Sequence, residues 1–204
     1  MLVVRIEPVY GRSSKVRVVF DGAMDVCLYP RDLKRLSIDE GSVVSRDELY
    51  GFFREVLLPR AKSRALHLLE RQDRTRSGLV NKLLEGGYPV DVAEEAVAYV
   101  EELGYVDDER YARQYISYHK KQASCRKLGM DLVRRGIDRE LADHILEEDY
   151  DTDEYGLIRA LLDKKHYDAG RADRKEQARM YRYLVSRGFD HSRAREALTA
   201  PSYQ

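Results

Sequence analysis

The sequence predicts a mainly α-helical protein, with three tandem three-helix repeats forming an elongated helical solenoid behind a small N-terminal β-meander. Three observations lead to this fold class. The first thirty residues alternate apolar and polar side chains, the chain after about residue 60 has helical periodicity, and that helical part repeats itself. Of the 204 residues, 35% are charged, against roughly 25% in an average soluble domain, which favours a surface-rich helical array over one compact ball.

The N-terminal segment has the pattern of a three-stranded meander. Apolar residues alternate with charged ones in three short runs within residues 4–28, and in the first run we expect Val4 and Ile6 on the apolar face. Asp21-Gly22 separates the second run from the third and indicates a tight hairpin, because such turns need positive φ angles. Pro8 cannot donate a hydrogen bond to a neighbouring strand, so it confines the first strand to an edge or to a short length.

After Pro30 the periodicity becomes helical. Ser45-Arg-Asp-Glu48 is a capping box, in which the serine side chain and the glutamate side chain satisfy each other's backbone N–H groups at a helix start. It predicts a helix that carries the apolar residues Leu49, Phe52, Phe53 and Val56.

The helical part contains an internal repeat. The segments 83–97, 132–146 and 184–198 align without gaps, and their glycines recur after 49 and 52 residues. Five positions match in all three copies: Leu83, Leu132 and Leu184; Gly87, Gly136 and Gly188; Tyr88, Ile137 and Phe189; Ala93, Ala142 and Ala194; Val97, Leu146 and Leu198. Chance similarity among helix-turn-helix pairs is the alternative, and so many matched positions argue against it.

In each copy the sequence indicates where one helix ends and the next begins. One helix ends at the glycine, which adopts the left-handed conformation cheaply, and the next helix starts at Asp138, at Asp190 or, in the first copy, after Pro89. An amphipathic segment precedes each copy, and adds a third helix to each repeat. We therefore divide the chain into an N-terminal β-meander plus helices at 1–59 and three-helix repeats at 60–106, 107–150 and 151–204.

Composition narrows the function. Lys and Arg balance Asp and Glu at 36 each, so the domain-wide basic bias of a bulk nucleic-acid binder is missing. Cys27 and Cys125 stand far apart and indicate free thiols in a reducing compartment. The start lacks the apolar core of a signal peptide, and no apolar run has the length of a membrane span. We expect a cytoplasmic protein without membrane association.

Two acidic clusters resemble catalytic or metal sites. Asp107 and Asp108 precede a helical run of tyrosines, but they stand where an N-cap and a first helical turn belong, and there the helix dipole favours negative charge. The run 149–153 resembles the start of a calcium loop, yet Glu154 and Ala160 hold the places where that loop needs Gly and a bidentate Glu. We interpret both clusters as helix caps and linkers, and expect no catalytic residue, metal or cofactor.

The remaining candidates are basic. Ten side chains form the candidate basic set: Arg74, Arg76, Lys120, Lys121, Arg126, Lys127, Arg134, Arg135, Arg179 and Arg182. Taken singly, such residues usually belong to a solvated face. Because a repeat places equivalent residues on equivalent faces, they could together line one edge of the solenoid and suit an extended partner, such as a filament, a groove or a nucleic-acid backbone.

Three motifs carry a family resemblance. They are RTRSGLVNKL at 74–83, GYVDDERYARQY at 104–115 and DLVRRGI at 131–137. In these the chain resembles RecX, the family of bacterial proteins that regulate the RecA recombinase. Gly78 replaces the family's common Glu, so a capping box begun by Thr75 would lack its return partner, and Ser124 stands near a position often filled by Gly.

The resemblance implies a function. RecX-like proteins are three-helix repeat proteins and not enzymes. They bind RecA filaments on single-stranded DNA, lie in the filament groove and restrain filament growth, ATP hydrolysis, strand exchange and the co-protease activity of the SOS response. DNA repair and recombination are the processes implied, and we expect a monomer with possible direct contact to DNA. A helical-repeat DNA-binding module acting directly on nucleic acid is the alternative.

Overall fold

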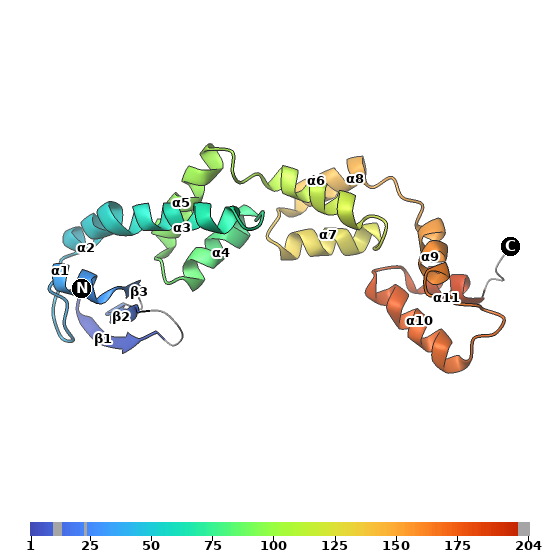
Figure 1. The fold of residues 1–204 in the computed structure, drawn as a ribbon, viewed down its shortest axis with the longest axis horizontal. Coiled ribbons are helices and arrows are strands. Elements are labelled where there is room, and N and C mark those ends of the chain that lie inside the picture. Colours follow the sequence, from blue (N-terminus) through green and yellow to red (C-terminus); the bar gives the residue numbers. More distant parts are fainter. Residues whose placement is uncertain (10–13, 23, 200–204) are drawn as a thin grey trace. The chain divides into compact units, whose positions relative to one another are not determined.

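The computed structural model describes residues 1–9, 14–22 and 24–199 (Figure 1). It divides into two compact units, Met1–Asp107 and Asp108–Gln204, hereafter the N-terminal unit and the C-terminal unit. Each is described by itself. The predicted fold class is confirmed, since a small three-stranded sheet is followed by three successive three-helix repeats.

The sheet is an antiparallel meander in the order β1-β2-β3, from β1 (Val3–Pro8), β2 (Val16–Phe20) and β3 (Asp25–Leu28). Gly22 has the positive φ of +85° expected next to the hairpin, and Pro8 ends the edge strand β1, as predicted. The placement of Val4 was wrong: its side chain is exposed, and Val3 is buried instead. The pairing register shifts between Val3 and Arg5, and this irregularity turns Val3 toward the core.

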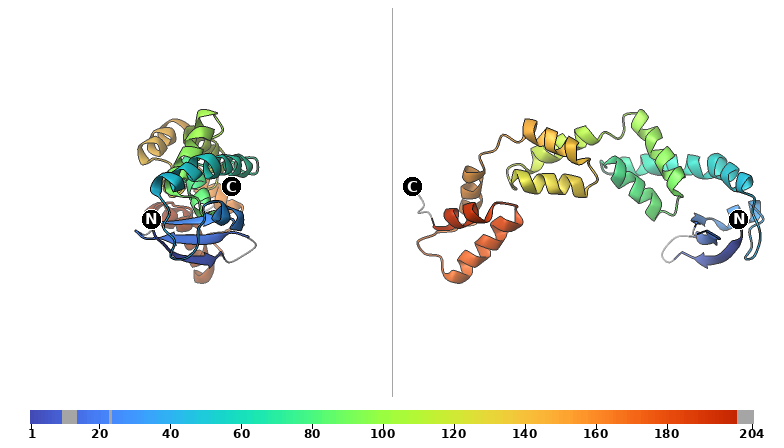
Figure 2. Two further views of the ribbon diagram at one scale, coloured as in Figure 1. Left: turned by 90° about the vertical axis from the view of Figure 1, so that its left-hand side faces the viewer. Right: turned by 180° about the vertical axis from the view of Figure 1, so that it is seen from behind.

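The helical part begins with α1 (Pro30–Arg35) and a long continuous stretch of α2 (Arg46–Phe52), the π-helical η1 (Phe53–Leu57) and α3 (Leu58–Leu69). The hydroxyl of Ser45 accepts from the backbone N–H of Glu48 at 3.1 Å, which confirms the predicted helix start. The π turn ends two residues before Pro59, which has no N–H to donate and whose ring crowds the preceding turn. Figure 2 shows the sheet beside this long helix.

The three repeats have closely similar boundaries. The first consists of α3, α4 (Arg76–Glu85) and α5 (Val90–Glu102). The second consists of α6 (Asp108–His119), α7 (Cys125–Arg134) and α8 (Arg139–Asp149). The third consists of α9 (Glu154–Asp163), α10 (Arg174–Ser186) and α11 (His191–Thr199).

The turn before the last helix of each repeat is built as predicted. Gly87, Gly136 and Gly188 have φ angles of +77°, +88° and +89°, a region that L side chains avoid. In the second repeat, Asp138 accepts hydrogen bonds from the backbone N–H groups of Glu140 and Leu141 and so caps α8. The repeated glycine is therefore a requirement of backbone conformation.

The two units bury their apolar residues differently. In the N-terminal unit one hydrophobic cluster runs from the sheet, for example Val18 and Phe20, through the long helix into the first repeat. In the C-terminal unit the second and third repeats each have a cluster of their own, centred on residues such as Ile116 and Phe189. Hydrogen bonds connect the second repeat with the third.

Candidate partner-binding surface

In the N-terminal unit the candidate basic set contributes Arg74 and Arg76, beside the N-cap of α4. The guanidinium of Arg76 pairs with Glu94 at 2.7 Å and with Glu101 at 3.2 Å, both on α5. The hydrogen bond to Glu94 is the main cause that raises the pKa of Arg76. Arg76 therefore ties α4 to α5. Arg74 differs, because its buried Nε has no hydrogen-bond partner among the described residues.

The residue Gly78 does not prevent a cap at this helix. The hydroxyl of Thr75 accepts from the backbone N–H of Gly78 at 2.9 Å, as the hydroxyl of Ser124 accepts from Lys127 N–H at 3.2 Å in the second repeat. Both departures from the family pattern leave the N-terminal side of the cap intact. Thr75 and Ser124 occupy equivalent places in their repeats and are both buried.

In the C-terminal unit several members of the basic set are engaged by acids. Lys120 pairs with Asp151 at 2.9 Å, on the chain leading to α9. Lys127 and Arg134 both reach Asp131, at 2.5 and 3.5 Å, along the same face of α7. The charge that these residues offer to a partner is therefore smaller than the sequence suggests.

Arg135 belongs to a small aromatic column between α6 and α7. Its guanidinium lies 4.7 Å from the ring centroid of Tyr115 and donates to the hydroxyl of Tyr111 at 3.0 Å. The ring of Tyr115 also stacks on His119, with centroids 4.1 Å apart. Partial burial works to lower the pKa of Arg135, but the two tyrosines outweigh it and raise the pKa. The column combines a permanent charge with flat aromatic faces.

Next to the column lies a cavity of about 360 Å³. It is lined by the end of α6, by one face of α7 and by the last turn of α10, which supplies Tyr183 and Arg187. The sequence interpretation assigned Tyr115 and His119 to helix packing and did not connect them with the third repeat. Their spacing along α6 was the available signal for a shared face, but nothing local predicts that α10 lies beside it.

Arg126 has a structural role inside the unit. Its guanidinium donates to the carbonyl oxygen of Gly188 at 3.1 and 3.3 Å, which joins α7 to the turn of the third repeat. Arg179 pairs with Glu176 at 3.2 Å, and Arg182 donates to the carbonyl of Ala178 on the same helix. Lys121 is exposed, and the described part of the chain gives it no ion pair or hydrogen bond.

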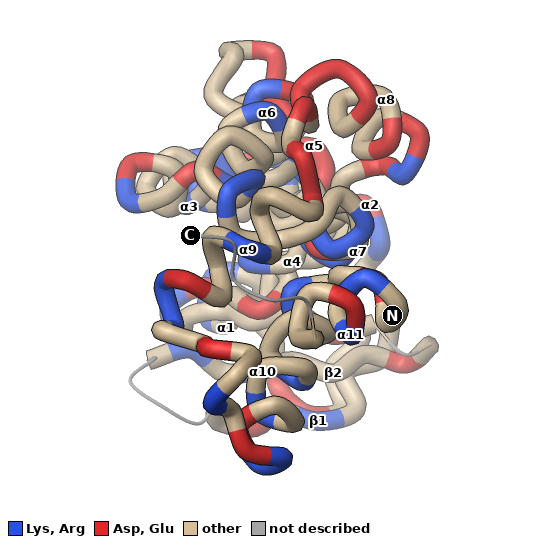
Figure 3. The backbone as a smooth tube through the Cα atoms, turned by 90° about the vertical axis from the view of Figure 1, so that its right-hand side faces the viewer, with Lys and Arg blue, Asp and Glu red and all other residues tan. Residues whose placement is uncertain are grey.

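Most described helices carry charges of both signs, whereas the charged residues of α3 are all basic and those of α5 are all acidic. Figure 3 shows basic and acidic residues following one another on most helices, α10 included. The exposed members of the basic set in the C-terminal unit are Lys121, Arg126, Arg134, Arg135, Arg179 and Arg182. The assignment of the whole set to a partner surface stays a prediction.

The acidic residues considered as calcium ligands have other partners. Asp149 pairs with Arg113 at 2.9 Å, Asp151 pairs with Lys120, and Asp153 caps α9 by accepting from Tyr155 N–H and Gly156 N–H. α6 begins at Asp108, directly after Asp107, where an N-cap was predicted. Within the described ranges, no cluster of three His, Cys, Asp or Glu residues could hold a metal ion. No described helix is both long and apolar enough to cross a membrane.

Fold and surface together define a class: a tandem three-helix repeat protein with a mixed basic and aromatic surface. Comparison with known proteins identifies the family. Models of the first, second and third three-helix domains of RecX match residues 61–99, 107–146 and 151–198, in chain order. This chain belongs to the RecX family.

Individual relatives agree with the family models. The regulatory protein RecX of Chlorobium limicola is 32% identical over 141 residues, which cover 68% of this chain and 87% of that protein. That of Caldanaerobacter subterraneus subsp. tengcongensis is 29% identical, with 92% of this chain and 93% of that protein covered. A crystal structure of regulatory protein RecX has a TM-score of 0.58 at 22% identity, covering 96% of this chain and 98% of that one, and shows the shared fold.

Proposed function

We propose that the protein is a non-catalytic regulator that binds RecA filaments on single-stranded DNA and inhibits filament extension, ATP hydrolysis, strand exchange and co-protease activity. The observation that supports this most strongly is the match of all three repeats, in order, to the three RecX domains. We further propose that it acts as a monomer in the cytoplasm. We propose four domains for it, an N-terminal domain at 1–59 and three-helix repeats at 60–106, 107–150 and 151–204.

The surface of the C-terminal unit suits such a partner. Exposed cations such as Lys121, Arg134 and Arg182 can meet acidic side chains or phosphates, while the column of Arg135, Tyr115 and His119 offers a flat aromatic face. Mixed basic and aromatic surfaces of this kind are typical of binding sites, because long-range attraction and close stacking contribute separately. In this proposal the protein acts by binding alone and catalyses no reaction.

The decisive experiment adds sub-stoichiometric purified protein to the cognate recombinase on single-stranded DNA and follows ATP hydrolysis. We expect hydrolysis to decline, because a protein that blocks extension affects more RecA subunits than it contacts. An unchanged rate at every ratio of the two proteins contradicts the proposal.

The structure also refines which residues to test. Arg126 and Lys127 hold internal contacts, so charge reversal there would disturb the unit itself. The informative variant reverses the exposed Lys121, Arg134 and Arg182 to Glu. Its matched control reverses three other exposed cations of the same unit: Arg139, Lys164 and Lys175. Inhibition that is lost in the first variant and kept in the second supports the assigned surface, and the reverse result excludes it.

The alternative, a module that acts directly on DNA, is favoured by one observation, the aromatic column beside exposed cations. Direct binding to phosphates weakens steeply with salt through counterion release, whereas the proposed function needs RecA to be present. Titration of labelled single-stranded DNA at two salt concentrations, with and without RecA, separates the two functions.

A further inference from the structure

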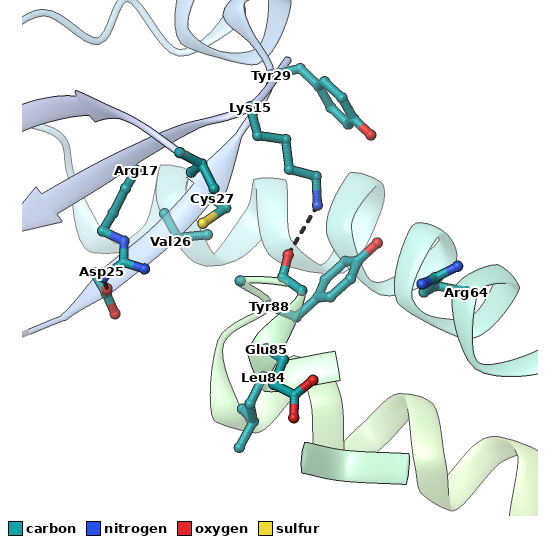
Figure 4. A pocket seen from close by; sticks show the side chains of 13 residues that line it. Lys15, Arg17, Asp25, Val26, Cys27, Tyr29, Arg64, Leu84, Glu85 and Tyr88 are labelled. Carbon is teal, nitrogen blue, oxygen red and sulfur yellow. Dashed lines mark hydrogen bonds and ion pairs between the residues drawn. The ribbon is translucent and has the colours of Figure 1, made fainter. Parts of the chain in front are cut away.

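The N-terminal unit contains a cavity of about 620 Å³ that the proposed function does not use. Strands β2 and β3 form one wall, α3 a second, and the turn between α4 and α5 a third (Figure 4). The polar side chains that line it include Lys15, Arg17, Tyr29, Arg64 and Tyr88. We call it the N-terminal cavity.

Hydrogen-bond donors gather on one side of this cavity. The ammonium group of Lys15 donates to the carbonyl of Gly86 at 3.1 Å and lies 4.9 Å from the ring centroid of Tyr88 and 5.4 Å from that of Tyr29. Arg64 reaches the same region from α3, and Figure 4 shows it beside the ring of Tyr88. Neither the Arg64 guanidinium nor the Tyr88 hydroxyl has a hydrogen-bond or ion-pair partner among the described residues.

The charges of the cavity favour an anion. Its two lining acids are already paired, Asp25 with Arg17 at 3.3 Å and Glu85 with Lys82 at 2.5 Å. Arg60, whose guanidinium lies 5.5 Å from the ring centroid of Tyr29, is paired with the buried carboxylate of Asp32 at 2.6 Å. Arg64 has no such acid among the described residues, so the wall carries more positive than negative charge.

Burial favours the uncharged form of two of these groups. It raises the pKa of Tyr88, whose hydroxyl therefore stays a hydrogen-bond donor. It also lowers the pKa of Lys15, because partial removal from water destabilises the ammonium charge. A bound anion would stabilise that charge, since an opposite charge nearby favours the ionised form.

We propose that the N-terminal cavity binds a small phosphate-bearing molecule, with Arg64 and Lys15 contacting phosphate oxygens and the Tyr88 hydroxyl donating to one of them. Arginine forks and lysine ammonium groups are the side chains that match phosphate oxygens. Val26 and Leu84 supply apolar side chains to the cavity wall. We expect them to contact the rest of the ligand, to which the phosphate is attached. The volume is that of a pocket for a small ligand, and walls on three sides leave little passage for a polymer backbone.

The test is calorimetric titration of the full chain, without RecA, with pyrophosphate, adenosine monophosphate and glucose 6-phosphate as the three probes, and with oligothymidylate as a polymer control. We expect saturable binding of at least one probe. Arg64→Ala should weaken it roughly ten- to hundredfold, because a charge-assisted contact is lost at an exposed position that the fold does not need. Tyr88→Phe keeps the ring and should weaken binding about three- to tenfold. Arg54→Ala, an exposed arginine of the same helical stretch outside the cavity, should leave it unchanged.

Three results would overturn the proposal. One is the absence of saturable binding for all three probes at millimolar concentration. Another is binding that Arg64→Ala and Tyr88→Phe leave unchanged, which places the ligand elsewhere. The third is tight binding of oligothymidylate that the two variants abolish while the small probes do not bind, which makes the site one for a polymer. Because RecA is absent from the titration, its outcome is independent of the filament assay.

Discussion

The two junctions within the units, sheet to first repeat and second repeat to third repeat, use the same turn in different surroundings. In the N-terminal unit the carbonyl of Gly87 accepts from the backbone N–H of Cys27 on β3 at 3.0 Å, at the wall of the N-terminal cavity, in a unit whose buried apolar residues form one cluster. In the C-terminal unit the carbonyl of Gly188 accepts from Arg126, and the carbonyl of Arg187 accepts from Ser124 N–H at 3.0 Å, between two separate clusters.

The difference shows what the repeated turn contributes. A helix C-terminus leaves carbonyl groups without partners inside the helix, and a glycine there permits close approach because it has no Cβ. Whatever lies before the repeat supplies the donors, a strand edge in one case and the start of α7 in the other. At the start of α7 the backbone N–H of Cys125 also donates to the carboxylate of Glu154 at 3.0 Å. The N–H groups at the N-terminal end of α7 are thus bound by the carbonyl that follows α10 and by an acidic side chain of α9.

The largest expected effect comes from Gly87→Ala. The new Cβ would overlap the side chain of Cys27 while the backbone has a φ of +77°, so strand β3 must move away from the first repeat. We expect the N-terminal unit to lose about 3–5 kcal/mol of unfolding free energy, measured by denaturant titration. The control is Gly41→Ala, whose φ is +82° but whose Cβ would meet no atom within 4 Å, so that only the backbone cost of about 1–2 kcal/mol remains. Equal losses in the two variants would contradict a docking role for Gly87.

Gly188→Ala should break the polar junction without unfolding the repeats. Its Cβ would overlap Lys127 and come within 2.5 Å of the Ser124 hydroxyl, the cap of α7. Since each repeat has its own apolar cluster, we expect local separation at a cost of about 2–3 kcal/mol. Hydrogen exchange should then accelerate at the Ser124 amide and stay slow in the middle of α10. Global unfolding would show that the two repeats form one cooperative body.

The turns and helix caps at both junctions could be predicted from the sequence. The residues that contact them from other elements could not. The glycines, the Ser45 cap and the Asp138 cap follow from short-range rules that depend on a few neighbouring residues. Arg126 entered the candidate basic set as a partner-binding residue, yet it binds a carbonyl 62 positions away. Val4 was misplaced because alternation alone does not reveal a register shift. Contacts between repeats depend on how separate elements pack, which no local pattern encodes.

Acid should lower the unfolding free energy of the N-terminal unit by protonating Asp32, with a smaller effect than either glycine substitution. It tests how much a buried ion pair adds to a unit that is otherwise held by one apolar cluster. Burial works to raise the pKa of this carboxyl, but the hydrogen bonds from Arg60 and from Tyr29 N–H outweigh it and hold the pKa below its ordinary value of 3.8. A lowered pKa means that the ion pair stabilises the fold fully above that value and ceases to do so as the pH falls through the folded-state pKa. We expect a loss on the order of 1–2 kcal/mol, followed by circular dichroism during urea titration at stepwise lower pH. Asp32→Asn should be less stable at neutral pH and lose less on acidification, and a wild-type slope in this variant would assign the acid sensitivity to other groups.

The smallest expected effect is that of Arg126→Ala, which removes the guanidinium from the Gly188 carbonyl and leaves every Cβ contact in place. Hydrogen bonds from a charged donor at a partly exposed site contribute about 1 kcal/mol, so the junction should open roughly five times more often. The Ser124 amide should exchange faster by that factor, far less than in Gly188→Ala. Arg134→Ala, on the same helix and paired among the described residues with Asp131 at 3.5 Å, serves as the matched control and should leave this amide unchanged. If Arg126→Ala also leaves the exchange unchanged, backbone packing of the glycine turn holds the repeats together, and Arg126 is available to a partner after all.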